Sequence, residues 1–228
     1  MRLDPYFELI PVIDLKDACV VSARAGLRQE YQAIHLHSKI VAESSIDGVI
    51  EAFMQLYPFK SIYIADLNAI CKTGNHQELI SRVLREYPEC EFWIDDGNQQ
   101  GLYSYSNPNY KSVYGTEVQE SEIKTMNPSD ILSLDFMQGH FLGHESWLKN
   151  HQSWSNRLMI MNLDHVGGKQ GPDINKLTEY ARLYPEKQIY AAGGVRNNDD
   201  LVTLKNIGVS GVLLSSALHQ GQIDFNKQ

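Results

Sequence analysis

The chain has 228 residues, a formal net charge of −8 at pH 7 and a hydrophobic content of 43%. These values fit one globular domain over residues 1–228 and exclude a disordered chain. The negative charge also disfavours nucleic acid as a partner.

The N-terminal segment carries acidic residues and has no long apolar run, so we do not expect a signal peptide. No stretch approaches the roughly 18 apolar residues of a membrane span. The three cysteines show no CxxC spacing, which favours a reducing compartment. We therefore expect a cytoplasmic protein with no membrane partner, and we expect Cys19 and Cys71 to be buried and inert.

Short apolar runs alternate with helix-length segments, which is the pattern of βα units around a parallel sheet. Eight strands are expected, at Glu8–Ile13, Ser61–Ala65, Glu91–Ile94, Ser112–Tyr114, Asp130–Leu134, Arg157–Leu163, Gln188–Ala192 and Gly211–Leu214. Apolar residues at three- and four-residue spacing predict helices at Ser44–Leu56, Gln77–Glu86, Ile174–Tyr184 and Asp199–Asn206.

Helix boundaries have local signals as well. Asp173 and Asn198 are expected N-caps, and Pro88 and Pro185 follow two helix ends. The polar segments 98–110 and 139–153 are expected to form weak helices or long loops.

Polar and glycine-rich motifs follow the expected strands: IDLKD, ADLNA, DDGNQ, YGTE, LDFMQG, LDHVGG, AGGVR and LSSA. In a (β/α)8 barrel, loops of this kind line the catalytic face. Doubly wound sheets also place sites at strand ends. The number of strands and an internal repeat favour the barrel.

The repeat begins with Ile13–Val21, which resembles Leu134–Leu142: each has an apolar residue, an aspartate, a short polar turn and an apolar pair. The DDG motif of the third unit faces AGG of the seventh, and LSSA of the eighth echoes YGTE of the fourth. These matches predict two (β/α)4 halves, with Asp14 and Asp135 on opposite sides of one mouth.

A further match relates the second and sixth units. Asp66 precedes Asn75 by nine residues, and Asp164 precedes Asp173 by nine. Each pair runs from a strand end through a glycine-containing loop to an expected helix start, so we align Asp66 with Asp164.

Over roughly residues 8–221, the chain resembles the histidine-biosynthesis barrels. These are phosphoribosylformimino-aminoimidazole carboxamide ribotide isomerase and its sister, the cyclase subunit of imidazole glycerol phosphate synthase. The matching stretches are IPVIDLKDACVV, ADLNAICKTGN, YGTE, ILSLDFMQGHFLG, AAGGVRNNDDL and GVSGVLLSSALHQG.

The resemblance implies an enzyme of amino-acid biosynthesis type, with Asp14 and Asp135 as its acid–base pair. The implied reaction is an Amadori-type isomerisation, in which an aminoaldose opens and becomes an aminoketose. Two carboxylates can divide the necessary proton transfers if their surroundings separate their pKa values.

The family also implies a phosphorylated substrate with a phosphate at each end. Residues expected near phosphate are Gly193, Gly194, Arg196, Ser215 and Ser216 on one side, and Gly115 and Thr116 on the other.

Two loops depart from the family pattern. The sequence 95–99, DDGNQ, replaces a Gly-Gly-Gly-Ile-Arg type loop, and its carboxylates would repel a phosphate. Gly167 stands where the isomerase usually has an aspartate. We therefore predict a paralogue acting on another substrate, one with a single phosphate.

The remaining candidates have bland alternatives. Asp66 and Asp164 either orient substrate or anchor loops, and His165 is kept as a substrate-binding residue because it lies beside Asp164. Asp95 and Asp96 form a solvated acidic loop, a contact to a substrate amine or, less favoured, a cation site. We expect neither metal nor cofactor, and a homo-oligomer is left open.

Two other functions stay open at this point. One is a lyase or cyclase in cofactor biosynthesis linked to pterins and one-carbon chemistry. The other is a barrel that binds a metabolite without catalysis, which the altered first phosphate loop motivates.

Overall fold

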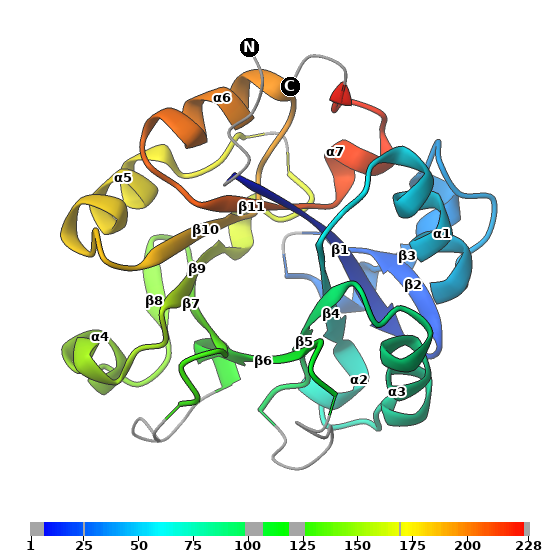
Figure 1. Cartoon of the computed structure of the whole chain (residues 1–228), viewed down its shortest axis with the longest axis horizontal. Helices are drawn as coiled ribbons and strands as arrows, with labels where there is room; N and C mark the ends of the chain where they lie inside the picture. Colours follow the sequence, from blue (N-terminus) through cyan, green and yellow to red (C-terminus); the bar gives the residue numbers. More distant parts are fainter. Residues whose placement is uncertain (1–6, 25, 99–106, 119–125, 169, 226–228) are drawn as a thin grey trace.

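Eight parallel strands close into a ring, each hydrogen-bonded to the next and the last paired with the first. The structure, a computed structural model, describes residues 7–24, 26–98, 107–118, 126–168 and 170–225. Figure 1 shows the ring of strands with helices outside it. The ring strands, in spatial order, are β1 (Glu8–Lys16), β4 (Ser61–Asp66), β5 (Glu91–Asp95), β6 (Tyr110–Gly115), β7 (Ile131–Met137), β9 (Arg157–Asn162), β10 (Gln188–Ala192) and β11 (Gly211–Leu214). The expected (β/α)8 barrel and its eight strands are confirmed.

Three short strands extend the barrel at the mouth. β1 turns back into β2 (Cys19–Ser22), which pairs with β3 (Gln32–Ala33), and β7 turns back into β8 (His140–Leu142). The sequence analysis missed all three because they are too short to show period-two alternation. The two hairpins explain why β1 and β7 run further than the expected strands.

The longer helices form where apolar residues recur on one face. In α1 (Ile46–Leu56), Ile46, Val49, Ile50 and Phe53 are buried, and the Ser45 side chain accepts from the N–H of Gly48 as N-cap. The same spacing produces α3 (Gln77–Glu86), α5 (Ile174–Leu183) and α6 (Asn198–Asn206). All four expected helices are confirmed.

One expected cap is correct and one is displaced. The Asp173 side chain accepts from the N–H of Lys176, as expected. At α6 the cap is Asn197, whose side chain accepts from the N–H groups of Asp199 and Asp200. Asn198 is instead the first helical residue. Two consecutive asparagines can each serve as an N-cap, so the residue type alone does not identify which of them does.

The polar segments resolve into short elements. Within 139–153 lie β8, α4 (Ser146–Lys149) and the 3-10 helix η4 (His151–Ser153). Of segment 98–110, residues 99–106 lie outside the described residues. Further short helices are η1 (Arg28–Glu30), η2 (Ile34–His37), α2 (Leu67–Ile70), η3 (Thr116–Val118), η5 (Leu163–His165) and α7 (Ser216–His219).

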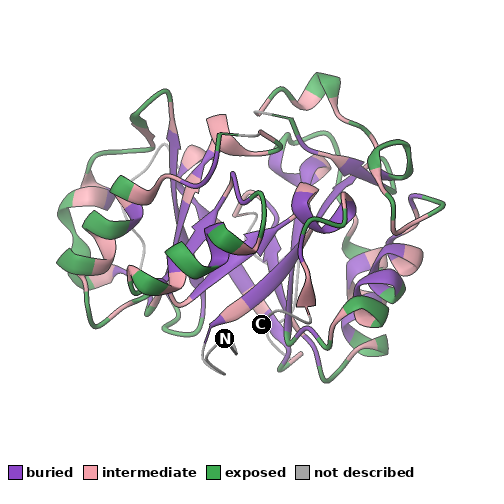
Figure 2. Cartoon of the chain, turned by 90° about the horizontal axis from the view of Figure 1, so that it is seen from above, coloured by how far each residue is buried: buried purple, intermediate pink, exposed green. Residues whose placement is uncertain are grey.

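The core has two parts, one outside the ring and one inside it. Buried residues between strands and helices make the larger cluster. Figure 2 shows the strands buried at the centre and exposed positions on the outer helices. Inside the ring, Trp93 and Tyr190 pack edge to face at 4.8 Å between ring centroids, with Ile10, Ile131 and other inward residues around them. The barrel is therefore filled below its mouth, as barrels of eight strands are.

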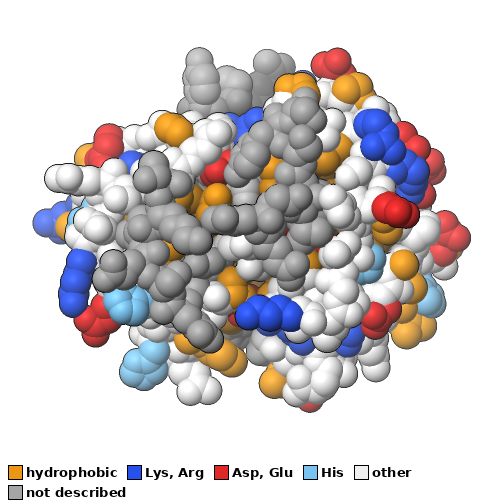
Figure 3. All heavy atoms as spheres, turned by 90° about the horizontal axis from the view of Figure 1, so that it is seen from below, with side chains coloured by type: hydrophobic (Ala, Val, Ile, Leu, Met, Phe, Trp, Pro, Cys, Tyr) orange, Lys and Arg blue, Asp and Glu red, His pale blue; other side chains and the backbone are white. Residues whose placement is uncertain are grey.

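The surface is mixed in charge. On the face in Figure 3, the described acidic and basic side chains are interspersed around the periphery. Among the described residues, no helix is long and apolar enough to cross a membrane.

Candidate active site

A pocket of about 830 Å³, part of it open to solvent, lies at the carboxyl ends of the barrel strands. Each of the eight strands, or the loop that follows it, contributes a lining residue. This is the face on which barrel enzymes carry their catalytic groups.

Asp14 and Asp135 both line this pocket. Asp14 of β1 lies opposite Val21 in its hairpin, and Asp135 of β7 lies opposite Leu142 in the other. The two aspartates thus occupy equivalent places in the two half-barrels. The structure brings together the pair that the sequence placed on opposite sides of one mouth.

The Asp135 carboxylate is held by three donors. It accepts from the Ser133 hydroxyl at 2.5 Å, from the Thr116 hydroxyl at 3.1 Å and from the backbone N–H of Glu117 at 2.9 Å. Burial and, second, the negative charge of Glu117 nevertheless raise the pKa of Asp135 to about 7, against the opposing effect of the hydrogen bonds. Asp135 is a fixed carboxyl group that titrates near neutrality.

The Asp14 carboxylate is in a different setting. It is 9% exposed, and no described residue donates a hydrogen bond to it. Burial raises its pKa to about 7, Arg28 lowers it and Asp95 raises it. Two buried carboxyls that each titrate near pH 7 can share the roles of acid and base.

Asp95 and Tyr63 stand between these two aspartates. The Tyr63 hydroxyl donates to Asp95 at 3.0 Å, the N–H of Gly97 donates to the other oxygen at 3.1 Å, and burial raises the pKa of Asp95 to about 6. Sequence analysis passed over Tyr63 because it lies inside an apolar run. Tyr63 lies two residues before Ala65, which lines the pocket, and side chains two residues apart in a strand point to the same side. This spacing could have identified Tyr63 as a residue that points into the barrel.

Arg28 and Glu117 form an ion pair across the mouth. Arg28 comes from η1, after the β2 strand, and Glu117 from η3, after β6; both line the pocket with Tyr31. Sequence analysis missed Arg28, which lies in a loop without periodicity. Glu117 was part of the quoted YGTE motif but received no role.

Gly193 and Gly194 line the pocket opposite this acidic side, together with Ser215–Ser216. Both glycines have positive φ, +97° and +89°. A Cβ at Gly193 would lie 2.7 Å from the carbonyl oxygen of Asn162, and one at Gly194 would lie 2.3 Å from that of Gly171. Close packing of the loop after β9 therefore requires glycine at both positions, whatever they bind.

The other residues expected near phosphate have protein partners. The Arg196 guanidinium donates to both oxygens of Asp200, at 2.9 and 2.7 Å, and does not line the pocket. Thr116 is fully buried against Asp135. A Cβ on Gly115 would lie 3.5 Å from one oxygen of Asp135 and 3.5 Å from one of Asp95, so this glycine separates two carboxylates.

Asp66 anchors a loop in this structure. Its carboxylate accepts from the N–H of Ala69 at 3.1 Å and from the N–H of His76 at 2.7 Å. The imidazole of His76 lies 2.8 Å from the same carboxylate, and its Nε2 accepts from the N–H of Ala18 at 2.9 Å. Because Nε2 is the acceptor, Nδ1 carries the proton toward Asp66. The chain of contacts holds the turn that follows Asp14.

The alignment of Asp66 with Asp164 is wrong by two residues. Leu15, next to Asp14, pairs with Asp66, and Phe136, next to Asp135, pairs with Asn162. Asp66 and Asn162 therefore correspond, and each caps the short helix after its strand. The nine-residue spacing was shared by chance.

Asp164 corresponds instead to Asn68. Asn68 accepts from the N–H of Asp17, and Asp164 accepts from the N–H of Gln138, in the equivalent turn of the other half. His165 is fixed by a contact of 2.6 Å between Nδ1 and the carbonyl oxygen of Gly171. Asp164 and His165 do not line the pocket.

The acidic loop after β5 is buried rather than solvated: Asp95 is 8% exposed and Asp96 3% exposed. In the part of the chain that the structure describes, no three His, Cys, Asp or Glu side chains are arranged to hold a metal ion. Cys19 and Cys71, expected to be buried, are exposed because both lie at turns of the mouth.

Comparison with known proteins bears on this site. The profile of the family described as Histidine biosynthesis protein matches residues 142–224. An uncharacterised protein of Methanocaldococcus jannaschii is 29% identical over 227 residues, covering 96% of each chain.

Named isomerases are more distant. The 1-(5-phosphoribosyl)-5-((5-phosphoribosylamino)methylideneamino) imidazole-4-carboxamide isomerase of the same organism is 21% identical, over 96% of each chain. The enzyme of that name from Thermoanaerobacter pseudethanolicus is 27% identical over 128 residues, about half of each chain at 51% and 53%. These matches confirm the resemblance expected from the motifs: the chain is similar to the histidine-biosynthesis barrels and is divergent from the named isomerases.

Proposed function

We propose that this barrel is an isomerase that converts a phosphorylated aminoaldose into an aminoketose, with Asp14 and Asp135 as its proton-transfer pair. One observation carries the proposal: two carboxyl groups from equivalent strand ends face one pocket, each with its pKa raised by burial to about 7. An acid and a base are most effective when their pKa values lie near the working pH.

The reaction needs proton transfers at four atoms of the substrate. One carboxyl group protonates the ring oxygen, so that the C1–O bond breaks and the iminium forms. The other carboxylate removes the proton from C2, which gives the enolamine. Return of that proton to C1 and transfer of the C2 hydroxyl proton to the first carboxylate then give the aminoketose and restore both carboxyl groups. Protons are only relocated, so no oxidant or reductant is required.

The phosphate end of the substrate is placed against Gly193, Gly194 and Ser215–Ser216. This side of the pocket offers serine hydroxyls and the backbone N–H groups of two loops, which suit an anion. The isomerase relatives support a phosphoribosyl substrate, because their name specifies two such groups.

The proposal is tested with two substrates and purified full-length protein. One is the aminoaldose of the named isomerases, and the other is the N-glycoside that ribose 5-phosphate forms with aniline, which carries one phosphate. We expect turnover of the second, and a loss on the order of 10²–10⁴-fold in Asp14→Asn and in Asp135→Asn. Glu89→Gln, an exposed carboxylate far from the pocket, is the matched control.

Two results would contradict the proposal. Unchanged rates in both aspartate variants would remove the acid–base pair from the mechanism. Tight phosphate-dependent binding without turnover of either substrate would identify a metabolite-binding barrel.

The pH profile gives an independent reading. Two carboxyl groups with pKa values near 7, one acting as the acid and the other as the base, should produce a bell-shaped kcat/KM profile centred near neutrality. A profile that is flat between about pH 5 and 9 would exclude carboxyl groups of this kind as acid and base.

A further inference from the structure

The two half-barrels present opposite chemistry to the same pocket. Asp95 pairs with Ala65 of β4, and Ala192 pairs with Met161 of β9, so Asp95 and Ala192 occupy equivalent inward positions. One half therefore carries a carboxylate where the other has a methyl group.

The next strand repeats the contrast. Ser112 and Val212 hold equivalent register positions in β6 and β11, which places Glu117 in the position of Ala217. Glu117 lines the pocket. The half formed by β5 and β6 thus contributes two carboxylates to the pocket lining, whereas the half formed by β10 and β11 contributes none.

We call the half formed by β5 and β6 the acidic half. Its backbone N–H groups already donate hydrogen bonds to carboxylates of the protein. The N–H of Gly97 donates to Asp95 at 3.1 Å, and the N–H of Glu117 donates to Asp135 at 2.9 Å. The equivalent N–H groups of the other half belong to Gly194 and Ala217, and no described side chain accepts from them. Protein carboxylates thus occupy the donors that an anion would need in the acidic half.

A buried acceptor without a donor points to the missing group. Asp14 is 9% exposed, lines the pocket and accepts no hydrogen bond from the described residues. Its oxygens face the pocket and are not enclosed by protein, so they can accept a hydrogen bond from a donor group of a bound ligand. The oxygens of Asp95 each accept one hydrogen bond and keep a lone pair.

Charge points the same way. The described residues that line the pocket include four carboxylates, from Asp14, Asp95, Glu117 and Asp135, and one cation, Arg28, which is paired with Glu117. A second phosphate beside Asp95 would meet the like charge of a carboxylate that is itself largely buried.

We propose that the substrate carries a single phosphate, held at the β10–β11 half, and a cationic hydrogen-bond-donating group at its other end, received by Asp95 and Glu117 at the β5–β6 half. The inference rests on the proposed function for the orientation of the substrate. It names Asp95 and Glu117 as residues that determine specificity.

A set of ligands with one scaffold tests this inference. Ribose 5-phosphate is joined as an N-glycoside to aniline, to para-aminobenzamidine or to para-aminophenyl phosphate, so that only the far end changes from neutral to cationic to anionic. Binding to the full-length protein is measured by calorimetry in an Asp135→Asn background, in which turnover of the N-glycosides is suppressed, with inorganic phosphate as a separate probe of the phosphate side.

The expected order of affinity is cationic, then neutral, then anionic, with a spread of about tenfold or more between the first and the last. Asp95→Asn should reduce the difference in affinity between the cationic and the anionic ligand. Glu117→Gln should tighten the anionic ligand more than Asp95→Asn does, because it also frees the Arg28 guanidinium. Glu89→Gln should leave the order unchanged.

Different negative results would contradict different parts of the two proposals. Binding of inorganic phosphate without a preference among the three ligands would overturn this inference alone. Tightest binding of the anionic ligand, with or without added Mg²⁺, would do the same and would indicate a second phosphate site. Absence of binding to inorganic phosphate would overturn the placement of the phosphate and this inference with it.

Discussion

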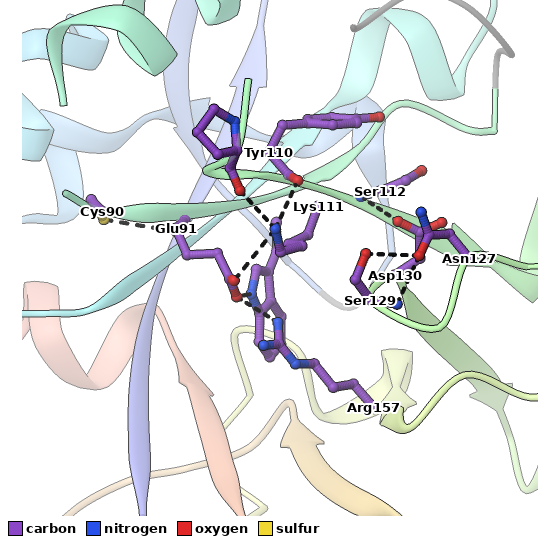
Figure 4. A network of polar contacts seen from close by, with 11 residues as sticks. Cys90, Glu91, Tyr110, Lys111, Ser112, Asn127, Ser129, Asp130 and Arg157 are labelled. Carbon is purple, nitrogen blue, oxygen red and sulfur yellow. Dashed lines mark hydrogen bonds and ion pairs between the residues drawn. The ribbon is translucent and has the colours of Figure 1, made fainter. Parts of the chain in front are cut away.

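Strand β5 carries two inward carboxylates, Glu91 at one end and Asp95 at the other, about 13 Å apart along the strand. At the bottom of the barrel, Glu91 accepts from Trp93 at 2.7 Å and forms ion pairs with Arg157 and Lys111 (Figure 4). At the mouth, Asp95 accepts only from neutral groups. Cations thus compensate the charge of Glu91 at the closed bottom of the barrel. The charge of Asp95 has no such compensation at the mouth, where a ligand enters.

The two ends of the barrel differ in the free-energy cost of burying an ionised carboxylate. An ion pair offsets the desolvation of Glu91, whereas burial of Asp14, Asp95 and Asp135 raises their pKa values and thus costs stability when they ionise. Sites that keep such a cost are characteristic of function rather than of folding.

The largest effect is expected from removing one uncompensated charge. Burial raises the pKa of Asp14 from 3.8 to about 7, so the folded chain holds this proton more tightly than the unfolded chain. The destabilisation is nearly absent below pH 4, grows as the pH rises to 7 and is constant above that. Asp14→Asn should therefore raise the free energy of unfolding at pH 8 by up to about 4 kcal/mol, while lowering turnover on the order of 10²–10⁴-fold.

Urea denaturation at about pH 4.5 and 8 measures this gain. Glu89→Gln removes an exposed charge and should show no such pH-dependent gain. A gain in Asp14→Asn that is equal at both pH values would contradict the assignment of the cost to ionisation.

A smaller effect, of opposite sign, is expected at the bottom of the barrel. Glu91→Gln leaves Arg157 and Lys111, whose side chains are 25% and 17% exposed, without their counter-charge. We expect a loss of about 2 kcal/mol in the free energy of unfolding, less than for a fully buried pair.

The control is Glu145→Gln, which breaks an exposed pair with Lys149 and should not change stability measurably. If Glu91→Gln were as stable as the parent protein, the bottom network would contribute nothing and the contrast between the two ends would fail.

The smallest effect concerns the cysteines. Cys19 and Cys71 are exposed at the mouth, whereas Cys90 is buried beside Glu91, where burial raises the pKa of its thiol to about 12. A disulfide reagent should titrate Cys19 and Cys71 in the native protein and Cys90 only after unfolding. Rapid reaction of all three would show that the bottom of the barrel opens under native conditions.

Much of the fold follows from the sequence because buried parallel strands leave apolar runs that a single pass along the chain detects. The Asp14–Asp135 pair could be predicted as well, since each aspartate opens a hairpin with the same pattern of residues. The match of DDG with AGG also placed Asp95 opposite Ala192, where the strand register puts them.

The rest depended on contacts between distant segments. Arg28 acquires its role from Glu117, 89 positions away in the chain, and no local pattern announces that pairing. The role of His76 could not be predicted from the sequence either, because its partners Asp66 and Ala18 come from two other loops. The error over Asp164 arose from counting residues where strand register was needed.

Gly167 sets a limit on how this mouth can evolve. Its φ is +68°, and a Cβ there would lie 2.2 Å from the carbonyl oxygen of Ala23, in the loop after β2. An aspartate, or any other side chain, cannot be placed at this position by one substitution, because the backbone of the facing loop occupies the space its Cβ would need. Asp95, by contrast, is one side chain at the end of a regular strand, so another residue there needs no change in the path of the backbone. A single substitution can thus alter the charge of the mouth at β5, whereas at Gly167 the facing loop would have to move as well.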